Sequence, residues 1–319
     1  MGILSVRDLS IIHKKTNKTI VRDINFDLEQ NEILGIVGES GSGKSITMHS
    51  ILGLSHESLD VKGRIVFEGT DLAETNQFDV VRGSKIGIIF QDPLNALNPI
   101  LRIEEQLRIL CQSHSLDYSS VKKEIYEIFD RIGIHHQDRV LKSFPHQLSG
   151  GMLQRVVISF VLLLKPKVII ADEPTTSLDV SVQKEIINIL KEIRDEYGIS
   201  IIFITHDLLL AKDICDRVII MYSGYIVEEG RKEDIFNNPL HPYTKGLILS
   251  VPDVNRKLES LPFIPGRVPH FLEIGVGCPF ANRCHLVEEV CYSDVPRLER
   301  IESSKVRCFV VMKKTATKI

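Results

Sequence analysis

Gly38-Glu-Ser-Gly-Ser-Gly-Lys44-Ser45 is the stretch of sequence that decides the fold. It fits the pattern G-x-x-x-x-G-K-[ST], and it lies between a short apolar run, Glu32–Val37, and a helix-compatible run, Ser45–Leu54. The first run is rich in β-branched residues, which is typical of a buried strand. A glycine-rich turn between a strand and a helix is the arrangement that cradles phosphate groups. We therefore predict a phosphate-binding loop rather than a chance glycine turn.

Each part of this loop has an expected role. The glycines allow a backbone path whose N–H groups converge on phosphate oxygens, and the helix N-terminus adds partial positive charge. Lys44 is expected to reach the β- and γ-phosphates of ATP, and the Ser45 hydroxyl to ligate Mg²⁺. The residues predicted to bind the nucleotide here are Gly38, Glu39, Ser40, Gly41, Ser42, Gly43, Lys44 and Ser45.

A second apolar strand ends in two acidic residues. The run Val168–Ala171 is followed directly by Asp172 and Glu173, which is the Walker B pattern. The first carboxylate is expected to hold Mg²⁺ and the second to polarise the attacking water as a general base. Alone, such a pair is more often a solvated strand end. Together with loop 38–45 it predicts a nucleotide-hydrolysing site.

The remaining elements predict an α/β fold. Strand-length apolar runs alternate with helical periodicity, which favours a parallel sheet with helices on its faces. A turn at Ser223-Gly224 separates the two strands of a predicted hairpin. The expected strands are Ile201–Thr205, Arg217–Tyr222 and Tyr225–Glu229, and the expected helices are Ile103–Leu110, Ser119–Ile132 and Val182–Arg194.

The composition sets limits on function. The 319 residues are 43% hydrophobic and 25% charged, with a net charge of −3, so nothing electrostatic indicates nucleic acid as a partner. No secretory signal is visible, and the longest apolar run, Val156–Leu164, is about half as long as a membrane-spanning helix requires. We expect a cytosolic chain whose membrane role comes through partners. Recurring prolines predict a domain boundary near residue 250, separating domains 1–250 and 251–319.

A third motif distinguishes among nucleotide-binding proteins with such a loop. Leu148-Ser149-Gly150-Gly151-Met152 precedes a helical run and closely resembles the signature motif of ABC ATPases. Two glycines and a serine at a helix N-terminus make a second anion-binding cap. The resemblance implies that Ser149, Gly150 and Gly151 close on ATP held by the loop of a partner subunit.

Other motifs that resemble those of ABC ATPases occur between residues 1 and about 240, in the same order as in the family. Gln91 resembles the Q-loop glutamine, which contacts Mg²⁺ and the γ-phosphate, and Ser177-Leu178-Asp179 resembles the D-loop. His206 resembles the switch histidine that contacts the γ-phosphate. The residue after the signature glycines is usually Gln and is Met152 here, as in the peptide-importer branch. Near residues 11 to 13, where the family has an aromatic residue that stacks on adenine, only His13 has a ring. Adenine is therefore expected to contact His13 or to be bound by other residues.

Four of the six cysteines gather near the C-terminus. Cys278, Cys284, Cys291 and Cys308 depart from the C-x2-C spacing of zinc sites and from the ferredoxin runs. Zinc, a [4Fe–4S] cluster and buried thiols therefore stay open from the residues alone, while disulfides fit a cytosolic chain poorly. The segment Gly277–Cys284 resembles the C-terminal extension of oligopeptide, dipeptide and nickel ABC importers. That resemblance implies an iron–sulfur cluster on these four cysteines.

The resemblance implies a P-loop NTPase fold with a RecA-like core, an antiparallel β subdomain, a helical subdomain at about 95–165 and a small cysteine-rich extension. It implies an ATPase subunit that energises import of peptides, or alternatively of nickel and related chelates. The implied partners are a second, different ATPase subunit, two transmembrane permease subunits and a separate solute-binding protein, at the cytoplasmic face of the inner membrane. A soluble ABC ATPase would need a coiled-coil insertion or a second cassette, and neither is present. An iron–sulfur regulator that only binds ATP would not need Glu173.

Overall fold

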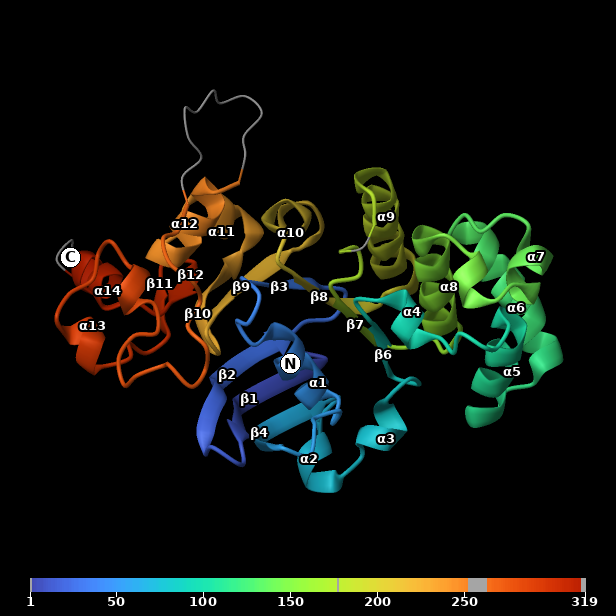
Figure 1. Ribbon diagram of the computed structural model, residues 1–319, viewed down its shortest axis with the longest axis horizontal. Coiled ribbons are helices and arrows are strands. Elements are labelled where there is room, and N and C mark those ends of the chain that lie inside the picture. The colour runs from blue at the N-terminus through green and yellow to red at the C-terminus, as the bar shows by residue number, and fades with distance from the viewer. Residues whose placement is uncertain (1, 177, 252–262, 317–319) are drawn as a thin grey trace. The chain divides into compact units, whose positions relative to one another are not determined.

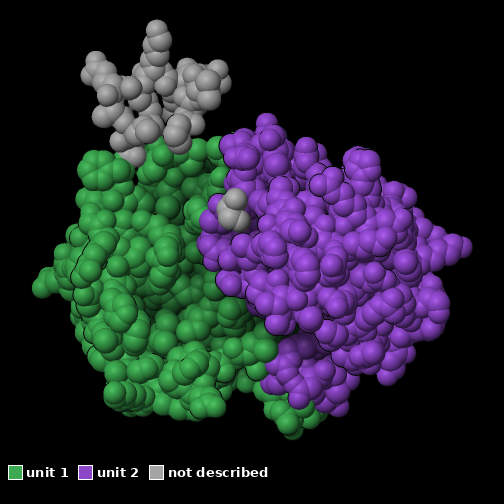
Figure 2. Space-filling model, turned by 45° about the vertical axis from the view of Figure 1, so that its right-hand side comes forward, with its two compact units in different colours: residues 1–76, 203–319 green, residues 77–202 purple. Residues whose placement is uncertain are grey.

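The computed structural model describes residues 2–176, 178–251 and 263–316. The chain divides into two compact units (Figure 2). Unit 1 comprises residues 1–76 and 203–319, and it contains loop 38–45 and the four clustered cysteines. Unit 2 comprises residues 77–202, and it contains the acidic pair and the signature motif. Within the described ranges, none of the helices has the length and hydropathy needed to span a membrane.

Unit 1 begins with an antiparallel sheet of four strands (Figure 1). In β1, buried residues such as Leu4 and Val6 alternate with more exposed ones, and they pair with apolar residues of both neighbours: Val6 lies opposite Phe26 and Ile65. This alternation places one face of the sheet in the core. In the order β2-β1-β4-β5, the strands are β2 (Lys18–Leu28), β1 (Leu4–His13), β4 (Leu59–Phe67) and β5 (Thr70–Asp71). The antiparallel β subdomain implied by the family resemblance is confirmed.

A second sheet of unit 1 holds the phosphate loop. β3 (Ile33–Val37) is fully buried and pairs in parallel with β9 (Arg217–Tyr222), as expected for a continuous apolar strand in a parallel sheet. β9 and β10 (Tyr225–Arg231) form the predicted hairpin. β12 (Ser304–Val306) pairs with β10, and β11 (Glu299–Ile301) pairs with β12. The C-terminal strands therefore extend the same sheet that carries the loop.

Helices surround these strands in unit 1. α1 (Lys44–Ile51) follows the phosphate loop directly. α10 (Leu208–Ile214) begins at an N-cap, Asp207, whose carboxylate accepts hydrogen bonds from the backbone N–H groups of Leu209 and Leu210. The other helical segments described in this unit are α2 (Leu72–Thr75), α11 (Lys232–Asn237), α12 (Pro242–Leu249), η2 (Ala281–Arg283), α13 (Val290–Ser293) and α14 (Phe309–Ala316).

Unit 2 combines a parallel strand pair with a group of helices. β6 (Ile86–Ile89) pairs in parallel with β7 (Val168–Asp172), and the division between the units falls within β8 (Ser200–Thr205). The helical segments are α3 (Phe78–Val81), α4 (Pro93–Ala96), α5 (Ile103–Ser113), α6 (Tyr118–Arg131), α7 (Gln137–Lys142), η1 (Pro145–Gln147), α8 (Gly150–Leu163) and α9 (Val180–Tyr197).

The helix and strand predictions agree closely with these bounds. α5 buries Ile103, Leu107 and Cys111, one residue per turn, which is the periodicity that predicted it. In Figure 1, α5 to α8 gather together at the end of unit 2, in the range where the helical subdomain was expected. The domain boundary near residue 250 stays a prediction, because residues 252–262 lie outside the described residues.

Candidate nucleotide site

Loop 38–45 has the backbone that a phosphate cradle requires. Gly41 and Gly43 have φ values of +80° and +100°, in the region that favours glycine. Gly38 lies so close to β9 that a Cβ atom there would be 2.3 Å from the carbonyl oxygen of Met221. Gly43 then forms the N-cap of α1, whose first backbone N–H groups point back toward the loop. The sequence therefore places glycine at the positions where a side chain would be strained or would clash.

Lys44 is held inside the loop. Its side chain is buried, with 5% of the residue exposed. The Nζ atom donates hydrogen bonds to the carbonyl oxygens of Gly38 at 2.8 Å and Glu39 at 3.1 Å. These two carbonyls set the position of the ammonium group at the mouth of the loop. The motif predicts that a charge in this position contacts phosphate oxygens.

Three residues from outside the motif support the loop. The N–H of Gly224, in the turn between β9 and β10, donates to the carbonyl of Ser42 at 2.9 Å. The N–H of Glu39 donates to the hydroxyl oxygen of Tyr243, a fully buried residue of α12, at 3.1 Å. The guanidinium of Arg283 donates to both carboxylate oxygens of Glu39, at 2.8 and 3.2 Å. Burial lowers the pKa of Arg283, but the hydrogen bonds to Glu39 and Tyr222 outweigh it, and the pKa is raised.

In unit 2, the acidic pair ends β7 as predicted. Asp172 is the last residue of the strand and is 5% exposed. Glu173 is half-buried and has a φ of +46°, a strained value for a residue with a side chain. Such strain is often found at functional sites, where the surrounding structure maintains it. Gln91, the Q-loop residue, donates from Nε2 to Oε2 of Glu173 at 3.1 Å. The structure thus brings together two of the predicted catalytic residues.

The signature motif lies at the start of α8 in unit 2. Ser149 is the N-cap, and its hydroxyl accepts a hydrogen bond from the N–H of Met152 at 3.3 Å. Gly151 packs against α9, where a Cβ atom would be 2.4 Å from Val182. Ser149 and Gly150 are exposed. α8 has 14 residues, and its polar, glycine-rich N-terminus faces solvent. Such a helix N-terminus can accept an anion from outside this chain.

The other predicted residues lie at element ends. Asp179 is exposed and precedes α9, while Ser177 lies outside the described residues. His206 is exposed and follows β8. His13 is half-buried at the end of β1, and its Nδ1 lies 2.9 Å from the Thr16 hydroxyl. Binding residues are often found in loops at the ends of strands and helices, and these residues have such positions.

The four C-terminal cysteines line one small, enclosed cavity in unit 1. They lie next to His241 and to apolar residues including Phe280 and Leu286. Burial raises the pKa of Cys278 to about 11, while a hydrogen bond from the backbone of Phe280 acts in the opposite direction. Backbone hydrogen bonds likewise reach Cys284 from Leu286, and Cys308 from Val311 and Val310. The cavity therefore combines soft sulfur donors with N–H groups that stabilise thiolates.

Family comparisons agree with this geometry. A family model described as "ABC transporter" matches residues 21–176, and one described as "Oligopeptide/dipeptide transporter, C-terminal region" matches residues 227–291. The oligopeptide transport ATP-binding protein OppD of Escherichia coli is 40% identical over 314 residues, which cover 97% of this chain and 93% of that protein. This chain belongs to the ABC transporter ATP-binding proteins of the oligopeptide and dipeptide family. The dipeptide transport ATP-binding protein DppD of Bacillus subtilis is also 40% identical, with 97% and 94% of the two chains covered.

Solved structures place the fold of this ABC ATPase among known cassettes. The cbiO1 protein of Clostridium perfringens, part of an ABC transporter complex, aligns with a TM-score of 0.64 and 30% identity over 74% of this chain and 91% of that one. The cassette MJ0796, solved as a dimer bound to ADP and phosphate, aligns with a TM-score of 0.63 and 25% identity over 72% and 98%. The predicted P-loop NTPase fold and ATPase activity are confirmed at the level of the family.

The thiol positions bear on the kind of metal that could bind to this ABC ATPase. Across residues 2–176, 178–251 and 263–316, no three His, Cys, Asp or Glu side chains are close enough to hold a single metal ion as they stand. A tetrahedral zinc site requires all four sulfurs at about 2.3 Å from one ion. In a [4Fe–4S] cluster, four thiolates bind four different irons, so their sulfurs lie further apart. The two kinds of site therefore require different spacings of the four sulfurs.

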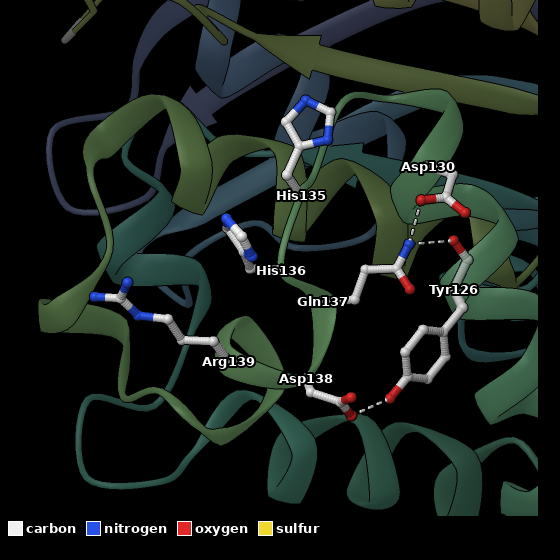
Figure 3. A pocket seen from close by; sticks show the side chains of 7 residues that line it. All are labelled: Tyr126, Asp130, His135, His136, Gln137, Asp138 and Arg139. Carbon is white, nitrogen blue, oxygen red and sulfur yellow. Dashed lines mark hydrogen bonds between the residues drawn. The ribbon is translucent and has the colours of Figure 1, made fainter.

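A polar hollow in unit 2 was not predicted from the sequence. It has a volume of about 540 Å³ and lies where α6 leads into α7 (Figure 3). Hydrogen bonds connect several residues of its lining: the Gln137 side chain donates to the backbone carbonyl of Tyr126 at 3.0 Å, and the Tyr126 hydroxyl donates to Asp138 at 2.6 Å. This pairing raises the pKa of Tyr126 to about 12. The hollow contains none of the predicted nucleotide-binding residues.

Sequence reasoning did not find the residues that support loop 38–45 from a distance. Ser223-Gly224 was predicted as a turn, but its position over Ser42 depends on the pairing of β3 with β9. Arg283 is 244 residues from Glu39 in sequence, and its neighbour Cys284 suggested only a metal site. No local pattern marks such long-range partners.

Proposed function

We propose that this ABC ATPase hydrolyses ATP to drive import of peptides through a membrane transporter. The observation that carries the proposal is 40% identity along almost the whole chain to proteins named for oligopeptide and dipeptide transport. The matched C-terminal region bears the same description. Import of nickel or a related chelate is the second candidate within the family. The peptide names of both relatives favour the first.

We propose the following division of roles within the chain. Loop 38–45 binds the phosphates through its N–H groups and Lys44, whose buried position between two carbonyls supports this role. Glu173 acts as the general base, and the hydrogen bond from Gln91 supports a shared function of these two residues. His206 contacts the γ-phosphate, and Asp179 takes part through the D-loop.

Mg²⁺ is expected to accompany ATP in this family. The proposed ligands are the Ser45 hydroxyl, the Gln91 side chain and the Asp172 carboxylate, all oxygen donors of the kind that Mg²⁺ prefers. Asp172 is buried at the end of β7, so a bound cation would compensate its charge. The ion would neutralise charge on the β- and γ-phosphates during phosphoryl transfer.

We propose that two ATPase subunits sandwich the nucleotides. The exposed N-terminus of α8 supports this arrangement, because Ser149 and Gly150 are available to a partner chain. Ser149, Gly150 and Gly151 would then cap ATP held on the partner's loop. The partner is expected to be a different ATPase chain. Two permease subunits at the cytoplasmic face of the inner membrane and a separate solute-binding protein would complete the importer.

We propose that Cys278, Cys284, Cys291 and Cys308 hold a [4Fe–4S] cluster with a structural role. The shared cavity, its soft donors and the backbone hydrogen bonds to sulfur support the fit. Burial raises the pKa of the Cys278, Cys284 and Cys308 thiols, so their binding to a metal would release protons. The cluster would link the segments on either side of η2, which carry Cys278 and Cys284, to Cys291 in α13 and to Cys308 just before α14.

Reconstitution tests the proposed function. The chain would be assembled with its partner ATPase, two permeases and the solute-binding protein in liposomes. We expect peptides to stimulate ATP hydrolysis and to enter the vesicles only when ATP is present. Uptake of nickel chelates without peptide uptake would favour the second candidate. ATP hydrolysis by the chain without any association with permeases would contradict both.

A further inference from the structure

Two aromatic rings from distant parts of unit 1 meet at the end of β1. The ring of His13 has its centroid 5.9 Å from that of Phe271, with the planes inclined at 57°. His270 lies beside them, with its ring centroid 4.3 Å from that of Phe271. His13 and Phe271 are half-buried and His270 is exposed, so these rings keep accessible surface. The adenine-stacking ring expected from the sequence thus has a companion from the C-terminal segment.

The segment that carries Phe271, residues 264–273, has a defined conformation. The carboxylate of Glu273 accepts hydrogen bonds from the N–H of His270 at 3.0 Å and from the guanidinium of Arg267 at 2.8 Å. The N–H of Glu273 donates back to the carbonyl of His270 at 2.8 Å. These bonds close the turn on which Phe271 lies. We call residues 264–273 the aromatic loop.

Arg283 connects the aromatic loop to the phosphate loop. Its guanidinium donates to both oxygens of Glu39 in loop 38–45, and it also donates to the carbonyls of Pro265 at 2.8 Å and Ile264 at 3.4 Å. The side chain is 6% exposed. One buried cation therefore fixes both the start of the aromatic loop and the second residue of the phosphate loop. Bidentate pairing with a carboxylate restricts the geometry as well as adding energy.

The hairpin of β1 and β2 gives the second connection. Val21 of β2 touches the phosphate loop, because its Cγ2 lies 3.1 Å from where a Cβ at Gly43 would be. Val21 pairs with Ile11 of β1. His13 follows two residues later, about 7 Å along the strand. The strand that carries His13 is therefore joined to the phosphate loop through the pairing of Ile11 with Val21.

A nucleotide base needs an aromatic or planar surface to stack on, and such stacking accepts any base. We propose that Phe271 stacks on the base of the nucleotide, together with His13, and that Arg283 positions the aromatic loop for this contact. The proposal rests on the proposed binding of ATP phosphates by loop 38–45. Phe271 is then the base-contact residue of this site, supplied from the C-terminal segment. Arg283 is a positioning residue that acts through the loop.

This arrangement separates the two ends of the nucleotide. The phosphates interact with loop 38–45, whereas the base interacts with Phe271 and His13. A ligand without a base, such as inorganic tripolyphosphate, would use only the first set of contacts. Comparing ATP with tripolyphosphate therefore isolates the contribution of Phe271 from that of the loop.

The first experiment measures the binding of Mg-ATP and Mg-tripolyphosphate to the full-length chain by calorimetry. We expect Phe271→Ala to weaken ATP binding about 5- to 150-fold, the range for the loss of one base–aromatic stack. Its affinity for tripolyphosphate should stay within about twofold of wild type. Phe263→Ala is the matched control, because Phe263 is 80% exposed and precedes the same loop. That variant should bind both ligands as wild type does.

The second experiment uses fluorescence. The chain has no tryptophan, so Phe271→Trp introduces a single reporter that keeps an aromatic ring at the site. ATP should quench its emission and tripolyphosphate should not. A Phe263→Trp chain should respond to neither ligand. The tryptophan variant retains the packing against His13, so it also separates loss of stacking from loss of folding.

The outcomes divide clearly. Two results would overturn the base contact and leave Phe271 as packing for His13. One is an equal loss of affinity for ATP and tripolyphosphate in Phe271→Ala. The other is tryptophan emission from the Phe271→Trp chain that saturating ATP does not quench. Wild-type chain that binds neither ligand would overturn the proposed phosphate site itself. Selective loss of ATP affinity with quenching of the tryptophan would support the base contact.

Discussion

Gln91 donates a hydrogen bond from Nε2 to Oε2 of Glu173 at 3.1 Å, and the Thr176 hydroxyl donates to the same oxygen at 2.9 Å. Two donors on one carboxylate oxygen occupy the lone pairs that would accept a proton from water. The Gln91 amide therefore occupies the carboxylate oxygen of Glu173 that a water molecule would otherwise use. Movement of Gln91 away from Glu173 would couple the Q-loop to hydrolysis.

Glu173→Gln tests the general base directly. The amide is nearly the same size, so the strained backbone at φ +46° and the phosphate loop should be kept. We expect the hydrolysis rate to fall about 100- to 10,000-fold while ATP binding persists. The rate is measured in the assembled transporter after the partner's own site has been disabled. Near-normal turnover would remove Glu173 from this role.

Lys44→Ala and Ser149→Arg should fail in different ways. Lys44 acts on the nucleotide of its own chain, so its loss should weaken ATP binding by the isolated chain about tenfold or more. Ser149 faces outward at the N-cap of α8, so an arginine there should leave that binding unchanged but prevent ATP-dependent association with the partner. Calorimetry and size-exclusion chromatography measure the two effects. Similar losses of ATP affinity in both isolated variants would contradict the two-cap arrangement.

The sequence was sufficient for the parts of the fold that follow from local chemistry. β3 and β7 were predicted because apolar runs make up most of these buried strands, and loop 38–45 was predicted because its glycines adopt conformations that other residues avoid. The hairpin of β9 and β10 followed from Ser223-Gly224 in the same way. In each case the pattern that made the prediction lies within about ten residues of sequence.

What the sequence did not reveal depends on contacts between distant segments. β11 and β12 have three residues each, too few to show a period, and β12 pairs with β10 about 75 residues earlier. Phe271 and His13 come from opposite ends of the sequence, and Arg283 joins the start of the aromatic loop to Glu39. The sequence around Arg283 and Cys284 gives no indication that Arg283 pairs with Glu39 of the phosphate loop. Such pairs are visible only when the chain is folded.

Cys291→Ser tests the proposed cluster. Anaerobically purified wild-type chain should be brown and contain about four irons per chain, and the variant should lose both colour and iron. Protease should then cleave residues beyond about 263 faster, since small cysteine-rich segments rely on metal for folding energy. Cys111→Ser is the control, because Cys111 is also buried but lies in α5 of unit 2. Colourless protein with stoichiometric zinc would contradict the cluster.

Two glycines with nearly the same φ offer a matched test of the support for the phosphate loop. Gly224 and Gly69 have φ values of +80° and +82°, but a Cβ at Gly224 would lie 2.0 Å from the carbonyl oxygen of Ile20, whereas nothing lies within 4 Å at Gly69. Gly69→Ala should cost about 1 to 2 kcal/mol of unfolding free energy from backbone strain alone. Gly224→Ala should cost about 2 to 5 kcal/mol, because a clash adds to the strain.

The same pair separates a local effect on binding from a general loss of stability. The N–H of Gly224 supports Ser42 in the phosphate loop, so Gly224→Ala should also weaken ATP binding, while Gly69→Ala should not. Chemical denaturation and calorimetry give the two quantities. Equal destabilisation by both substitutions would show that Ile20 yields to the added methyl group and that the close approach is not a constraint.

The ion pair of Arg283 and Glu39 gives the last prediction. Arg283→Met leaves the Glu39 carboxylate without its two guanidinium hydrogen bonds, next to the loop that must accept the negative phosphates. An uncompensated unit charge a few ångströms away repels them by a few kcal/mol at an effective dielectric constant of about 20. We therefore expect affinity for both ATP and tripolyphosphate to fall about tenfold or more. Calorimetry of the full-length chain measures both.

Adding Glu39→Gln to Arg283→Met distinguishes charge from positioning. The double variant removes the repelling carboxylate, so affinity for tripolyphosphate should recover to within about threefold of wild type, a coupling of about 1 kcal/mol or more between the two positions. Affinity for ATP should recover less, because the carbonyls of Ile264 and Pro265 still lack the guanidinium that fixes the aromatic loop. Full recovery of both ligands would mean that Arg283 only neutralises Glu39. No recovery of either would mean that the guanidinium acts on the fold of the segment as a whole.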